Sequence, residues 1–175
     1  MQILAIETSC DETAIAVVDC AGGVEAPRFT VRAHVVATQI PVHRPFGGVV
    51  PSLAKREHLL NLPLVYDQVV AELKTKNYKL AVDRIAVTVG PGLEPALWTG
   101  INFANDLSAK TGVPCIGVNH LEGHMYSNWI SPSEVEGLKK IAFPAVVLLV
   151  SGGHTALIVM DGMQSWQKLG ETQDD

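Results

Sequence analysis

One short pattern occurs twice in this chain and constrains its fold more than any other feature. Residues 4–19 and residues 148–161 each read as an apolar run, a polar turn, a Thr-Ala pair, a second apolar run and an aspartate. Two apolar runs around a polar turn predict a β-hairpin, and a hairpin repeated about one domain length apart predicts a duplicated fold. We therefore expect a first lobe over residues 1–131 and the first strands of a second lobe over residues 144–175.

Apolar runs and breaker residues also predict a mixed sheet covered by helices. Five runs have the length of strands, at residues 3–6, 14–18, 29–37, 85–89 and 115–118. Longer patterns predict helices at residues 51–73, 95–110 and 120–130, and prolines and glycines predict a loop at residues 39–50. The first three strands follow one another without a helix and should be antiparallel, whereas strand–helix alternation predicts parallel strands after them. The sequence therefore predicts an α/β lobe with a mixed five-stranded sheet.

Two histidines stand four residues apart in the segment His120-Leu121-Glu122-Gly123-His124. On a helix, residues at this spacing leave the same face, about 6 Å apart along the axis. Two neutral imidazoles can then bind one metal ion at about 2.0–2.1 Å each, with a third ligand from elsewhere. A solvated helix face with two histidines is the alternative. In the metalloprotease helix a glutamate directly follows the first histidine, so Leu121 at that place disfavours protease chemistry.

Asp11 and Glu12 are adjacent acids in the turn of the first hairpin. Neighbouring residues of an extended chain face opposite ways, so we expect at most one of the two to reach a reacting atom directly. Such a carboxylate can act as a base, position a water or hold a cation. Simple solvation of the turn is the alternative.

Both hairpin turns carry residues that suit anion binding. Ser151-Gly152-Gly153 leaves its backbone amides open to a phosphate, and Thr8-Ser9 offers hydroxyls and amides of the same kind. Two such turns facing each other across a cleft would hold the phosphates of a nucleotide, whereas two ordinary hairpin turns are the alternative. His154, beside the glycine turn, is either a phosphate contact or a structural residue.

Composition narrows the setting in which the protein works. The mean hydropathy is +0.22 and the net charge is −5, which disfavours indiscriminate binding to nucleic acids. The longest apolar run, residues 145–150, is far too short to cross a bilayer, and the first four residues lack the basic flank of a signal peptide. Three cysteines without a CxxC motif indicate reduced thiols. We therefore expect a cytoplasmic protein with no membrane segment.

Five motifs occur in order along the chain: IETSCDET at residues 6–13, GGVVP at 47–51, GPGL at 90–93, HLEGH at 120–124 and VSGGHT at 150–155. Together they resemble the TsaD-type tRNA threonylcarbamoyltransferases, relatives of enzymes formerly called O-sialoglycoprotein endopeptidases. The resemblance covers essentially the whole chain. It implies an actin/hexokinase/Hsp70-like (ribonuclease H-like) fold of two lobes, of which this chain contains the first and the beginning of the second.

The resemblance also implies a reaction. Family members transfer a threonylcarbamoyl group from threonylcarbamoyl-AMP to the N6 amine of the adenosine that follows the anticodon, in tRNAs reading codons that begin with A. His120 and His124 would hold one iron (or zinc) ion with an aspartate from the part of the family's chain absent here. Asp11 and Glu12 would be the acidic pair near the reaction centre. An adenylate or ATP-type ligand would lie along Leu149, Val150, Ser151, Gly152 and Gly153.

Family resemblance further implies two protein partners. One is a non-catalytic TsaB-type paralogue, which would dock on the predicted helices at residues 52–73 and 96–110. The other is a small TsaE-type ATPase. Two other functions compete with this reading: a non-catalytic scaffold lobe of the same complex, and a small-molecule kinase of the actin fold. A kinase needs a catalytic carboxylate and Mg²⁺, and the paralogue class lacks the histidine pair.

The hairpin at residues 145–160 carries nine large apolar side chains with few obvious partners downstream. If about half of them face a missing core, the burial that is lost is on the order of 10 kcal/mol. We therefore expect these 175 residues to associate through a sheet edge or exposed helices, and not to catalyse the reaction unaided.

Overall fold

The computed structural model describes residues 1–23, 27–128, 130, 142–151 and 154–173. Five strands form one sheet in the order β3-β2-β1-β4-β5. They are β1 (Gln2–Glu7), β2 (Glu12–Ala21), β3 (Arg28–Thr38), β4 (Arg84–Gly90) and β5 (Cys115–Asn119). Strands β1, β2 and β3 pair antiparallel, whereas β1 pairs parallel with β4 and β4 with β5. The predicted mixed five-stranded sheet is confirmed.

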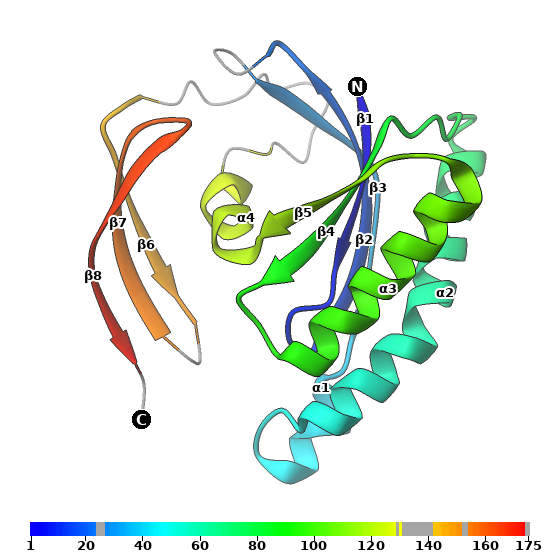
Figure 1. The fold of residues 1–175 in the computed structure, drawn as a ribbon, viewed down its shortest axis with the longest axis horizontal. Helices are drawn as coiled ribbons and strands as arrows, with labels where there is room; N and C mark the ends of the chain where they lie inside the picture. The colour runs from blue at the N-terminus through cyan, green and yellow to red at the C-terminus, as the bar shows by residue number, and fades with distance from the viewer. Residues whose placement is uncertain (24–26, 129, 131–141, 152–153, 174–175) are drawn as a thin grey trace.

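Two long helices, α2 (Pro51–Thr75) and α3 (Glu94–Thr111), cover one face of this sheet (Figure 1). Pro51 begins α2, where a missing N–H costs nothing, and Gly112 ends α3 in the left-handed conformation with φ 74°. The main core fills the space between these helices and the sheet. Its buried members include Leu4, Ile6, Ile15, Val17, Leu62, Val65, Val69, Leu73, Ile85 and Val87.

Segment 39–50, predicted as a loop, contains a short helix and one 3-10 turn. Helix α1 spans Ile40–His43, and the 3-10 turn spans Arg44–Phe46. Pro41 and Pro45 stand in the first turn of these two elements, which tolerate a residue without a backbone N–H. Neither element is long enough to show an apolar period, so prolines and glycines were the stronger sequence signal.

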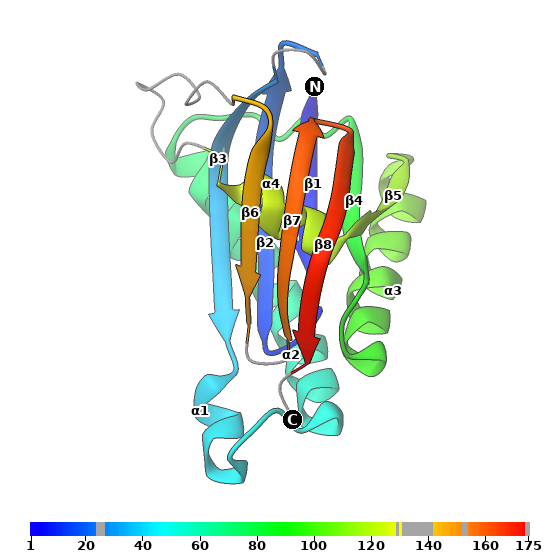
Figure 2. The same cartoon turned by 90° about the vertical axis from the view of Figure 1, so that its left-hand side faces the viewer.

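Three more strands form a second, antiparallel sheet in the order β6-β7-β8. They are β6 (Ala145–Val150), β7 (His154–Gly162) and β8 (Ser165–Gln173). The antiparallel hairpin β6-β7 is the one that the internal repeat predicted, and β8 adds a third strand, so that the second sheet has the order and the pairing of β1-β2-β3. Figure 2 shows it in front of the first sheet, with α4 (His120–Ser127) between the two. The lobe bounds at residues 131 and 144 stay a prediction, since residues 131–141 lie outside the described part of the chain.

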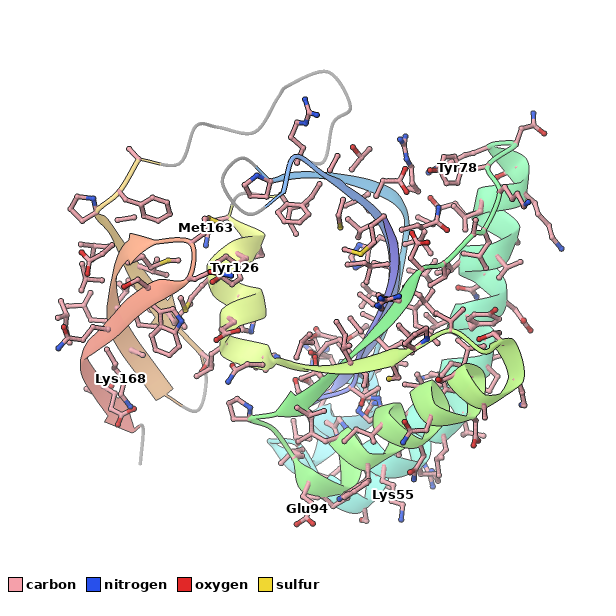
Figure 3. All side chains as sticks on the ribbon, turned by 45° about the horizontal axis from the view of Figure 1, so that its top comes forward. Lys55, Tyr78, Glu94, Tyr126, Met163 and Lys168 are labelled. Atoms are coloured by element: carbon pink, nitrogen blue, oxygen red, sulfur yellow. The ribbon has the colours of Figure 1, made fainter. Side chains whose placement is uncertain are left out.

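Helix α4 follows β5 of the first sheet and packs against the second sheet. Met125 is buried and packs with Val147, Ile158 and Met160 of the second sheet. The Tyr126 hydroxyl donates to the main-chain carbonyl of Met163 at 2.6 Å, and Figure 3 shows both residues where α4 meets the turn after β7. Helix α4 ends at Ser127, three residues earlier than predicted.

Cys10, Cys20 and Cys115 are all free thiols. Within the described residues, none of the helices combines the length and the apolar character that crossing a bilayer needs.

Strand β6 packs one face against the protein and leaves the side chains of its other face exposed. Val147 is 8% exposed, whereas its neighbours Val146, Leu148 and Val150 are 68, 61 and 71% exposed. Strand β6 is also at the edge of its sheet, so its free N–H and C=O groups can pair with another chain. An open edge beside an apolar face is typical of a surface that another polypeptide covers.

We expect the 175-residue chain to self-associate through this surface at micromolar concentration. Leu148→Lys places a charge in the apolar face and should shift the chain toward monomer, whereas the exposed helix residue Lys55, replaced by glutamate, should leave the association unchanged. Size-exclusion chromatography with light scattering measures the mass of each variant. A monomeric parent chain would contradict the prediction.

Candidate metal centre and the acidic turn

The end of β5 and the beginning of α4 place the two histidines of the HLEGH motif. Asn119 caps α4, because its Oδ1 accepts the N–H groups of Leu121 at 2.8 Å and Glu122 at 3.3 Å. His120 is therefore the first helical residue, and His124 follows one turn later on the same face. The two Nε2 atoms lie 3.0 Å apart, and the ring planes cross at 80°. The predicted helix and the predicted convergence of the two rings are both present.

The separation of the two Nε2 atoms suits one shared metal ion. With metal–nitrogen bonds of about 2.1 Å, a separation of 3.0 Å corresponds to an angle of about 90° at the metal. That angle separates neighbouring ligands of a six-coordinate metal and is narrower than the tetrahedral value. Among the described residues, no cluster offers three or more histidine, cysteine or carboxylate ligands. The described residues thus offer two nitrogens that could share one metal ion, and a complete site would need further ligands.

Glu7, at the end of β1, holds His120 from the other side of its ring. His120 Nδ1–H donates to Glu7 Oε2 at 3.2 Å, and Ser9 Oγ lies 3.2 Å from the same nitrogen. Burial alone would raise the pKa of Glu7, but hydrogen bonds from His120, Ser9 and Thr88 outweigh burial and lower that pKa to about 2. An ionised Glu7 keeps the His120 proton on Nδ1 and leaves Nε2 as a ligand. This arrangement is the usual support of a metal-binding histidine.

Sequence reasoning missed Glu7. A signal existed, because Glu7 ends a strand directly before the Thr8-Ser9 turn, and ligands of open α/β sheets bind at the carboxyl ends of strands. The pattern could not show that the carboxylate reaches a histidine 113 residues further along the chain.

The structure places the predicted turn residues Thr8 and Ser9 in two different environments. Thr8 is fully buried, and its hydroxyl donates to the Ala96 carbonyl of α3 at 3.0 Å. That hydroxyl is therefore committed to the fold, and this geometry does not favour a substrate role for it. Ser9 is also buried, but its hydroxyl faces His120, while its carbonyl accepts the N–H of Leu93 at 2.8 Å. Ser9 therefore lies at the candidate metal centre, beside His120.

The end of β6 meets the histidine pair. Leu149, Val150 and Ser151 share a cavity of about 270 Å³ with His120 and His124, together with residues of α4 and Leu148. The predicted ligand segment and the predicted metal ligands are thus brought together. Gly152 and Gly153 lie outside the described residues, as does the side chain of His154, the first residue of β7.

Asp11 and Glu12 face different surroundings. Asp11 is partly buried and lines a cavity of about 320 Å³ whose other walls come from α1 and the glycine turn, among them His43, Arg44 and Gly48. Glu12 begins β2 and is exposed. The expected separation of the two side chains is present, and Asp11 is the one beside a cavity.

The sequence profile of TsaD, described as tRNA N6-adenosine threonylcarbamoyltransferase, matches residues 30–175. The chain belongs to the TsaD family. Family relatives described by the same words match all of this chain: 46% identity for Polaromonas naphthalenivorans, 45% for Desulfitobacterium hafniense and 42% for Thermosipho melanesiensis. The chain covers 46, 47 and 49% of these three relatives, and so spans about half the length of the TsaD-family proteins it matches.

Solved structures with a similar fold are more distant in sequence. YeaZ from Pseudomonas aeruginosa has a TM-score of 0.50 at 19% identity, over 98% of this chain and 66% of YeaZ. The Aquifex aeolicus PPX-GPPA enzyme has a TM-score of 0.50 at 11% identity, over 97% of this chain and 52% of that protein. At these identities the likeness concerns the fold, which confirms the actin-like architecture expected for a TsaD-family chain.

Proposed function

We propose that this chain, within a full-length TsaD-family protein, serves tRNA modification. The reaction is transfer of the threonylcarbamoyl group from threonylcarbamoyl-AMP to the N6 amine of the adenosine after the anticodon, in tRNAs reading codons that begin with A. The observation that carries this proposal is the cavity in which both histidine Nε2 atoms meet the end of β6, in a chain of this family. Two histidines that can share a metal ion, beside the strand end that leads into Ser151-Gly152-Gly153 in the sequence, suit an acyl-phosphate substrate.

His120 and His124 would hold an iron or zinc ion, with an aspartate from the other half of the protein as a further ligand. When bound, such an ion supplies Lewis-acid polarisation of the carbamoyl carbonyl. The chain's own contribution is to orient the ligands: Glu7 and Ser9 contact His120 Nδ1 and aim Nε2 at the cavity.

The adenylate would lie along the end of β6. Main-chain amides at Ser151, Gly152 and Gly153 would face its phosphate, and Leu149 and Val150 would contact its apolar parts. We also assign phosphate contacts to His154 and to the first hairpin turn at Thr8-Ser9, where the Ser9 main-chain N–H donates to Glu7 Oε1 at 2.5 Å and would have to exchange that partner for the phosphate.

Asp11 is the better placed of the two acids to take a proton. The amine nitrogen attacks the carbamoyl carbon, the bond to the AMP oxygen breaks, and AMP leaves while the amine loses one proton. Asp11 follows Ser9, which contacts His120, by two residues, and it lines a cavity of about 320 Å³ that is separate from the one at the histidine pair, whereas Glu12 is exposed. We assign proton acceptance or water positioning to Asp11 and a supporting electrostatic role to Glu12.

Exposed apolar side chains on the two long helices suit a protein partner. Leu59, Leu60 and Leu64 of α2 are 56, 59 and 59% exposed, and Trp98 of α3 is 52% exposed. We assign this surface to the TsaB-type paralogue, and we expect a TsaE-type ATPase to join the complex. The setting would be the cytoplasm, where tRNA is available.

The test is a transfer assay with the full-length protein, both partner proteins, threonylcarbamoyl-AMP and tRNA. Mass spectrometry of digested tRNA should show threonylcarbamoyl-adenosine, and a matched tRNA with guanosine after the anticodon should show none. Asp11→Asn should lower the transfer rate by about 100-fold or more, as expected for loss of a general base. Phosphorylation of a small molecule without tRNA would instead favour the kinase alternative. No product in the complete mixture would contradict the proposal.

A further inference from the structure

A buried chain of hydrogen bonds connects the start of α2 with the turn that carries Asp11 and Glu12. Its side-chain members are Gln39, His43 and His58, which are 1, 4 and 0% exposed and which we call the buried relay. Three polar side chains so deeply buried are costly unless every donor and acceptor is satisfied. The chemistry assigned above uses none of them.

Two main-chain carbonyls, which can only accept hydrogen bonds, determine the donors and acceptors of Gln39 Nε2 and His58. Gln39 Nε2 lies 3.5 Å from the Ala54 carbonyl oxygen, so this end of the amide is the NH₂ group. The same NH₂ donates to His58 Nδ1 at 3.2 Å, which leaves the ring proton on Nε2. His58 Nε2–H then donates to the Cys10 carbonyl at 3.1 Å. The carbonyls of Ala54 and Cys10 thus independently require the same arrangement.

The donors and acceptors of Gln39 Oε1 and His43 are determined in the same way. Gln39 Oε1 accepts from His43 Nε2–H at 3.0 Å, and His43 Nδ1 accepts the main-chain N–H of Val50 at 3.3 Å. The Thr13 hydroxyl lies 2.8 Å from His58 Nδ1 and shares the single lone pair of that nitrogen with the Gln39 NH₂ group. Burial lowers the pKa of His58, which favours the neutral ring that these contacts require. Both histidines are therefore neutral and carry their proton on Nε2.

The relay holds the acidic turn at two consecutive carbonyls. His58 binds the carbonyl of Cys10, and the main-chain N–H of Gln39 donates to the carbonyl of Asp11 at 2.8 Å. His43 and Asp11 also line the same cavity of about 320 Å³. Because the backbone on both sides of the Asp11 side chain is restrained, its carboxylate has few positions open to it.

We propose that the buried relay of Gln39, His43 and His58 is the positioning device for the Asp11 carboxylate in threonylcarbamoyl transfer. This inference rests on the function proposed above. His58 is a positioning residue, since it acts on the reaction through the backbone of the turn.

Two substitutions at His58 separate positioning from mere stability in the full-length protein. Glutamine can place an NH₂ near the Nε2 position and keep the contact with Cys10, whereas asparagine reaches only the Nδ1 position and loses that contact. We expect His58→Asn to lower kcat by about 10- to 100-fold with KM for tRNA within about twofold, and His58→Gln to stay within about fivefold of the parent.

The thermal unfolding midpoints of both variants show whether a loss of kcat merely reflects a loss of stability. Equal rates for the two variants, or a rate in His58→Asn like that of the parent, would overturn the relay's role. A parent protein that forms no product would overturn the proposed function, and the transfer role of the relay with it.

A second measurement addresses the relay without any activity. Long-range ¹H–¹⁵N spectra of histidine-labelled parent protein at about pH 7 distinguish the two neutral tautomers from the charged ring. We expect the Nε2–H tautomer for both His43 and His58, assigned through the spectra of single variants. An Nδ1–H tautomer or a charged ring at either position would overturn the relay as described.

Discussion

Replacing His124 by alanine is expected to remove specific metal binding and to abolish transfer. Two Nε2 atoms 3.0 Å apart leave room for one shared ion, so loss of either ring leaves a single protein ligand from this chain. Loss of a supporting contact alone costs a metal site about 10- to 100-fold in affinity, and loss of a ligand should cost at least the upper value. We expect affinity for iron or zinc to fall by about 100-fold or more, and the transfer rate with it.

Calorimetric titration of the metal into chelator-treated full-length protein measures the affinity, and tRNA digestion with mass spectrometry measures the rate. His34→Ala is the matched control, because His34 is exposed on β3, away from α4. It should leave both quantities unchanged. Parent-like metal affinity in His124→Ala would remove the histidine pair from the metal site, even if activity fell.

Gly100→Ala and Gly123→Ala are expected to change stability in opposite directions, although both glycines are helical. A Cβ at Gly100 would lie 2.4 Å from Thr8 Oγ1, and Thr8 is buried and bonded to α3. We expect Gly100→Ala to lower the free energy of unfolding by about 1–3 kcal/mol, because overpacking outweighs the better helix propensity of alanine. A Cβ at Gly123 meets nothing within 4 Å, so Gly123→Ala should raise the free energy of unfolding by about 0.5–1 kcal/mol.

Urea unfolding followed by circular dichroism gives the free energy for each variant. The double variant Thr8→Ala/Gly100→Ala identifies the cause, since removal of Thr8 Oγ1 frees the space for the new methyl group. Its loss should be smaller than the sum of the two single losses by about 1 kcal/mol or more. If the losses of the two single variants add up to the loss of the double variant, the Thr8 side chain is not what the new methyl group at position 100 disturbs.

Much of the fold could be predicted from short stretches of sequence. Strand β4 (Arg84–Gly90) and helix α3 (Glu94–Thr111) lie within one residue of their predicted bounds. A glycine or proline stands at both ends of α3 and at the carboxyl end of β4, and the apolar run itself begins directly after Asp83-Arg84. The third strand of the second sheet, β8, had no such apolar run, since Gln167, Lys168 and Glu171 interrupt it. Pairing with β7 supplies what its own sequence does not indicate.

The sequence by itself determined which residues are candidates for the chemistry: the histidine pair, the acidic turn and the Ser-Gly-Gly turn are each recognisable from neighbours within a few positions. Only the tertiary structure decided how they are supported. Glu7 reaches His120 across 113 positions, and His58 reaches Cys10 across 48. The physical reason is that helix and strand patterns arise from local backbone periodicity, whereas hydrogen bonds between distant side chains depend on how sheets and helices pack.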